Sequence, residues 1–162
     1  MQLKELHDYL KRIAEEHREI GHTEMRPRYF FYHHESLVQD FNTMEEVCVT
    51  VESPIGSLVK EAQEYRDRKR MALVVHVQAG KLNSNEERLD ASDKAERIMK
   101  DIIARILHDS AMKLCPILLR NVDASGWVYE HMESKLPNFV SCVLGLELVG
   151  YDYITYDESK WL

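Results

Sequence analysis

The chain has 162 residues, of which 44% are hydrophobic and 30% are charged, and its formal net charge is −7. This length fits one domain, and the composition excludes a chain that is disordered throughout. The acidic charge disfavours sequence-specific nucleic-acid binding, because a duplex-binding surface usually needs a concentrated basic face. We therefore expect a single folded domain over residues 1–162.

The cysteines and the N-terminus indicate a cytoplasmic protein with no membrane contact. Cys48, Cys115 and Cys142 are odd in number and widely spaced, which is typical of buried thiols in a reducing compartment. The first residues are charged and helical in pattern, unlike a signal peptide. The longest apolar runs are shorter than the roughly 18 residues that a membrane-spanning helix needs.

Two helices are predicted, one over residues 3–20 and one over about 86–109. The second has a broad apolar face and is expected to be buried against a sheet. The first has a narrow stripe, so it either packs on a sheet or pairs with a copy or partner helix. This stripe consists of Leu3, Leu6, Leu10, Ile13, His17 and Ile20.

Apolar, β-branched runs predict strands over residues 28–33, 44–52 and 71–77. Ser53-Pro54 is expected to stop the second, and residues 55–64 form a short helix or a loop. Residues 115–137 are treated as a connection. Residues 139–149 and 151–156 form either two strands joined at Gly150 or one long strand bent by a bulge there.

These elements predict an α+β fold in the order α-β-β-β-α-β-β, with a single mixed or antiparallel sheet packed by two long helices. Residues 66–70, which include Arg66, Arg68, Lys69 and Arg70, are expected to be a solvated charge run or a contact with a partner.

No residue pattern carries a catalytic, cofactor or metal site. His17 and His22 are five residues apart, and the adjacent His33 and His34 would point to opposite faces of a strand, so neither pair has metal-ligand spacing. The glycines are scattered singly and form no phosphate loop. We expect no enzyme, no cofactor and no bound metal. An enzyme would instead require three or more of these dispersed side chains to converge in a deep pocket: His17, His33, His34, His76, Glu45 and Asp152.

The element order resembles that of the small neck and tail-terminator proteins of tailed bacteriophages. The resemblance rests on the N-terminal amphipathic helix, the strand over residues 71–77, the helix around residues 91–107 and the late strand Leu146-Glu147-Leu148-Val149-Gly150-Tyr151. It covers most of the chain, although residues 115–137 are longer than such a unit needs, and no functional residue of the family carries over. It implies a structural virion protein that assembles in the host cytoplasm as a ring joining head and tail or capping the tail. Its partners would be copies of itself and other neck or tail proteins, with DNA only as passing cargo.

Two parts of the chain are candidate subunit contacts: the stripe of the first helix and the aromatic C-terminal end. The predicted interface residues are Leu3, Leu6, Leu10, Ile13, His17, Tyr151, Tyr153, Tyr156 and Trp161. The alternative function is a small cytoplasmic adaptor or regulatory domain that binds a partner through its N-terminal helix.

Overall fold

The computed structural model describes residues 1–31, 46–80, 84–118, 122–134 and 138–160. Within them lies one five-stranded sheet in the order β1-β2-β3-β5-β4, in which β1 runs parallel to β2 and all other pairs are antiparallel. The predicted α+β class with a mixed sheet is confirmed. The elements are α1 (Leu3–Glu16), β1 (Tyr29–Phe31), β2 (Val47–Glu61), β3 (Glu64–Gln78), α3 (Asn85–Ala111), β4 (Val128–Glu133), β5 (Phe139–Tyr153) and a 3₁₀ turn (Glu158–Lys160).

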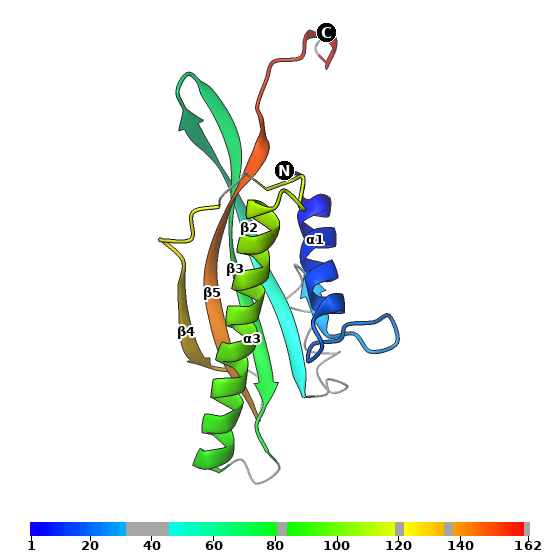
Figure 1. The fold of residues 1–162 in the computed structure, drawn as a ribbon, viewed down its shortest axis with the longest axis vertical. Helices are drawn as coiled ribbons and strands as arrows, with labels where there is room; N and C mark the ends of the chain where they lie inside the picture. Colours follow the sequence, from blue (N-terminus) through cyan, green and yellow to red (C-terminus); the bar gives the residue numbers. More distant parts are fainter. Residues whose placement is uncertain (32–45, 81–83, 119–121, 135–137, 161–162) are drawn as a thin grey trace.

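Both helices cover the same face of the sheet, and they run antiparallel to each other (Figure 1). Alternate residues of the central strands point into this layer. The β5 residues that face the helices are all at most 6% exposed: Val140, Cys142, Leu144, Leu146 and Leu148. The core therefore lies between one sheet face and the two helices.

The narrow stripe of α1 packs into this same core. Leu6, Leu10 and Ile13 are at most 4% exposed and belong to one apolar cluster with the sheet. Beside them the Tyr9 hydroxyl donates to Asp109 Oδ2 at 3.2 Å, and Arg105 Nε donates to Asp109 Oδ1 at 2.8 Å. Of the two interpretations of the stripe, packing on the chain's own sheet is the one observed.

The first helix ends at Glu16, four residues earlier than predicted. His17 has an extended backbone, with φ −75° and ψ 120°, and its Nδ1 accepts from the backbone N–H groups of Glu19 and Ile20. The histidine side chain thus satisfies amide groups in the turn that follows the helix. The apolar spacing could not show this earlier helix end. Ile20 lies beyond the turn but is again fully buried in the core, so it fits the spacing of the helix stripe.

The second and third strands are much longer than predicted, and residues 55–64 form neither a helix nor a loop. β2 continues past Pro54, where the register shifts between Glu52 and Ile55, so a bulge accommodates the proline. The two strands then pair from Ile55 opposite Arg70 to Glu61 opposite Glu64. Ala62 takes φ 55° at the turn. The turn contains no glycine or asparagine that would indicate a hairpin in the sequence.

The C-terminal part differs from the prediction at two places. The presumed connection over residues 115–137 contains β4, which pairs with β5 at the edge of the sheet. The final strand is one long strand, and it ends at Tyr153 rather than near Tyr156. Its register shifts between the pairs Arg68 with Val149 and Arg66 with Tyr153, as the bent-strand interpretation requires.

Candidate assembly surface

The hairpin made by the end of β2 and the beginning of β3 is largely exposed. We call residues 55–70 the arm. Figure 1 shows that it projects past the ends of α1 and α3, next to the C-terminal segment. Leu58 and Tyr65, on one face of the arm, are 57% and 44% exposed, and Ile55, on the other face, is exposed as well. A contiguous group of exposed apolar side chains can form a protein contact, and the exposed side chains of Leu58 and Tyr65 share a face here.

The basic run lies in the arm, where each cation has an acidic partner within the chain. Arg66 pairs with Glu61 and lies 3.7 Å from the centre of the Tyr153 ring. Arg68 and Arg70 both pair with Glu147. Burial raises the pKa of Glu147, but hydrogen bonds from these two arginines outweigh it and hold the pKa below its usual value. These contacts join the arm to β5, so the arm is braced at its base.

The N-terminus of the chain contacts the base of the arm. The Met1 amino group lies 3.5 Å from Asp67 Oδ2. A Cβ added at Gly150 would be only 3.1 Å from the Met1 nitrogen and 3.3 Å from the Asp67 carbonyl oxygen. Glycine at the bend of β5 therefore allows three distant parts of the chain to meet there.

The predicted interface residues separate into different environments. Leu6, Leu10 and Ile13 are buried in the chain's own core and so are not exposed for a subunit contact in this fold. Leu3 is partly exposed. His17 is half-buried, with Nε2 3.4 Å from Asp101 Oδ2.

At the other end of the chain, Tyr153 and Tyr156 are exposed beside the arm or beyond it. The side chain of Tyr151 and the whole of Trp161 lie outside the described residues. Sequence reasoning missed the arm itself, since its strands carry charge and its turn lacks a recognisable turn dipeptide.

A polar cluster on the opposite face of the sheet was also missed. His76 Nε2 lies 3.1 Å from Thr50 Oγ1, and its Nδ1 lies 2.8 Å from Ser141 Oγ. Burial lowers the pKa of His76 from 6.5 to about 4, so the ring is neutral at pH 7. A histidine beside a serine can serve as a base, but Ser141 is only 3% exposed. The cluster as placed joins β2, β3 and β5 and presents no reactive group to solvent.

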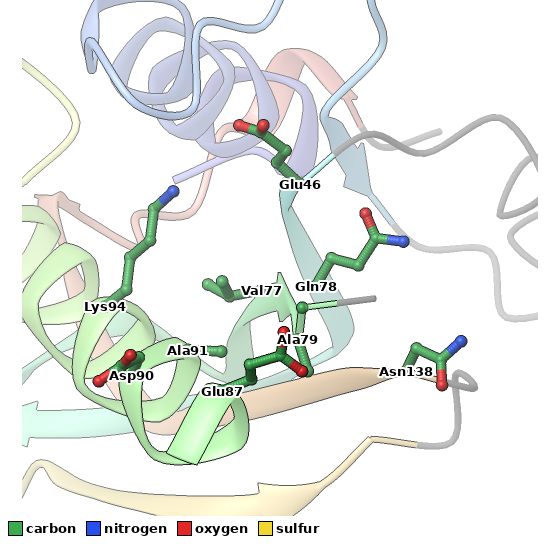
Figure 2. A pocket seen from close by; sticks show the side chains of 10 residues that line it. Glu46, Val77, Gln78, Ala79, Glu87, Asp90, Ala91, Lys94 and Asn138 are labelled. Atoms are coloured by element: carbon green, nitrogen blue, oxygen red, sulfur yellow. The ribbon is translucent and has the colours of Figure 1, made fainter. Parts of the chain in front are cut away.

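A pocket of about 690 Å³ opens where α3 begins, and Figure 2 shows side chains from α3 and from the strand ends around it. Its polar lining includes Glu46, Glu87, Asp90 and Lys94. Neither His17 nor His76 lines it. His33, His34, Glu45 and the side chain of Asp152 lie outside the described residues. Among the residues that are described, no three histidine, cysteine or acidic side chains are grouped to hold a metal ion.

No helix in the described ranges contains an 18-residue stretch apolar enough to cross a membrane. Comparison of the chain with family models, with curated proteins and with solved structures finds no match.

Proposed function

We propose that this chain is a non-catalytic structural protein that assembles with copies of itself into a ring, as a head–tail joining or tail-capping component of a tailed phage would. The observation that carries the proposal is the arm, a braced hairpin that extends past the helices with exposed apolar side chains. A rigid projection of this kind buries little within its own chain. Covering its exposed apolar side chains with another copy would be favourable, because it removes them from water.

The charge distribution agrees with a ring through which DNA passes. The arm contains five basic and three acidic residues and so carries +2, whereas the whole chain carries −7. The rest of the chain is therefore strongly acidic. A channel lined by that part would repel the phosphate backbone and let DNA slide as cargo.

The adaptor alternative receives less support. It requires Leu6, Leu10 and Ile13 to bind a partner, but these side chains already complete the core. Exposing them would cost roughly 1.5–3 kcal/mol for each side chain. An adaptor that used α1 would have to open its own fold first.

The proposal is tested by measuring oligomeric state over a range of protein concentrations, with light scattering after size exclusion and negative-stain microscopy. We expect a closed ring of several copies. Leu58→Glu should weaken assembly, because it replaces an exposed apolar side chain of the arm with a charge. Met25→Glu is the matched control, since Met25 is 94% exposed and remote from the arm in sequence.

A particle that stays monomeric at high concentration, forms no ring and binds no portal or tail protein would overturn the proposal. Equal weakening by the Leu58 and Met25 substitutions would show that the arm is not the contact. Circular dichroism of each variant checks that the fold is retained.

A further inference from the structure

A single histidine joins β1 to the end of α1. The segment between the two elements, residues 17–28, is the blue loop at the lower end of α1 in Figure 1, and we call it the connector. His22 Nδ1 accepts hydrogen bonds from the backbone N–H groups of Arg28, at 3.0 Å, and of Tyr29, at 3.2 Å. The backbone N–H of His22 donates to the carbonyl oxygen of Ala14 in α1 at 3.1 Å. His22 is only 8% exposed, so water cannot readily replace these partners.

These contacts fix the protonation state of the His22 ring. A ring nitrogen that accepts hydrogen bonds has a free lone pair, so Nδ1 carries no proton and Nε2 carries the one proton of the neutral imidazole. In the imidazolium form both ring nitrogens are donors. An N–H at Nδ1 would face the N–H groups of Arg28 and Tyr29, and both hydrogen bonds would be lost at once. This attachment of β1 therefore requires a neutral His22.

The surroundings of His22 also favour the neutral ring. Burial lowers the pKa of His22 below the usual 6.5, and electrostatic interactions with Lys11 and His7 on α1 lower it further, whereas Glu15 on the same helix raises it. Glu15 is itself paired with Lys11. From β1, the Tyr29 ring lies 6.0 Å from the His22 ring. Protonation is therefore disfavoured while β1 is attached and becomes ordinary once β1 is released.

The backbone ladder of β1 and the side chain of Arg28 add contacts that do not depend on acid. The three residues of β1 pair with β2, and the Val49 N–H donates to the Arg28 carbonyl oxygen at 2.8 Å. Arg28 Nη1 donates to the Ile20 carbonyl oxygen at 3.0 Å, and a guanidinium keeps its charge throughout the physiological pH range. A three-residue strand at the edge of a sheet is among the parts of a fold that open most easily. The loss of two further hydrogen bonds can thus decide whether β1 stays in place.

We propose that His22 is an acid-sensitive latch, which holds β1 on the edge of the sheet while its ring is neutral and releases β1 when the ring takes up a proton. Release leaves β2 at the edge, because β1 is its outer neighbour in the described sheet. An uncovered edge can pair with a strand of another chain. The latch goes beyond the proposed ring assembly and does not depend on it.

Amide hydrogen exchange followed by NMR measures the release, and the amide of Val49 is the reporter, because its hydrogen-bond acceptor is the residue before β1. The released ring titrates near 6.5, so the latch is closed above that pH and opens as the pH falls below it. From pH 7 to pH 5 the protection factor of Val49 should fall by up to about thirtyfold. A constant protection factor would refute the latch.

The amides of the β3–β5 ladder show whether the opening is local. Release of β1 leaves these strands paired, so Val49 should be less protected than they are at both pH values. Equal protection would mean that only unfolding of the whole chain exposes Val49, which would overturn the proposal.

Two substitutions separate the proton from the contact. His22→Asn places an amide oxygen where Nδ1 stands and cannot take up a proton, so the protection of Val49 should be nearly the same at pH 7 and pH 5. His22→Ala removes the acceptor, so the protection should be low at both pH values. His108→Asn is the control, because His108 is well exposed and should leave the native behaviour unchanged. A pH dependence that persists in His22→Asn would assign the effect to another group, such as His7, and would refute the latch.

A measurement on the native chain needs no substitution. The chemical shifts of the ring nitrogens distinguish a nitrogen that carries a proton from one that does not. At pH 7 they should show that Nδ1 of His22 is unprotonated and that Nε2 is protonated. The opposite tautomer would contradict the latch, because that ring could not accept from Arg28 and Tyr29.

Discussion

Acid should destabilise this fold through His76, which joins three strands on the face of the sheet away from the helices. The folded protein holds the ring neutral, because burial lowers its pKa from 6.5 to about 4. The unfolded chain binds a proton at the ordinary pKa. The stabilisation from this group is complete above pH 6.5, decreases as the pH falls from 6.5 through about 4, and changes little below that.

The size of the effect follows from the two pKa values. Each unit of difference corresponds to about 1.4 kcal/mol, so a fall from 6.5 to about 4 corresponds to about 3 kcal/mol of lost stability in acid. Small domains are stable by only about 5–15 kcal/mol. Protonation of this single side chain would therefore remove a large share of the stability.

The assay is urea unfolding followed by circular dichroism at several pH values from about 7 to about 4, for the native chain and for His76→Gln. Glutamine cannot take up the proton, so the variant should be less stable near pH 7 and should lose less stability in acid. His22 also has a pKa lowered by burial, and the comparison of the two proteins removes its contribution. His108→Gln is the control, because His108 is well exposed. An identical pH dependence for the native chain and His76→Gln would refute the reasoning.

Three further substitutions test the packing and the helix ends, each by chemical unfolding at neutral pH. Leu10→Ala should lower the free energy of unfolding by about 2–5 kcal/mol, because the side chain fills the core. Leu3→Ala, at a partly exposed position, should lower it far less. Equal losses would mean that α1 does not pack as described. Tyr9→Phe should lower the free energy of unfolding by about 1–3 kcal/mol, since it removes a hydrogen-bond donor from the fully buried carboxylate of Asp109. An unchanged stability would contradict that hydrogen bond. Ser84→Ala should cost about 1 kcal/mol, because its hydroxyl caps α3; no change would show that the cap is satisfied in another way.

Much of the fold could be predicted from local patterns. The apolar spacing over residues 86–109 indicated a buried helix, and α3 spans Asn85–Ala111. The apolar run after residue 139 predicted a strand, and of the two alternatives for residues 139–156 the single strand with a bend near Gly150 is the one observed. Such patterns are visible in the sequence because the buried face of a helix or strand places apolar residues at regular intervals along the chain.

The arm and the edge strand β4 could not be predicted in the same way. The arm consists of strands with charged residues and a turn without glycine, so its pairing depends on the contacts between β2, β3 and β5. The strand β4 lies in a segment that the sequence presents as a connection. Neither element forms until residues far apart in the chain are brought together.

Apolar periodicity was enough to establish the α+β class and the positions of the two long helices. The folded chain sets where the apolar faces go: the stripe of α1 packs into the chain's own core, whereas Leu58 and Leu89 lie on its surface. The fold also sets the strand register that places His76 between Thr50 and Ser141. Periodicity records burial, whereas register and the choice of neighbouring strand arise from contacts between residues far apart in the chain.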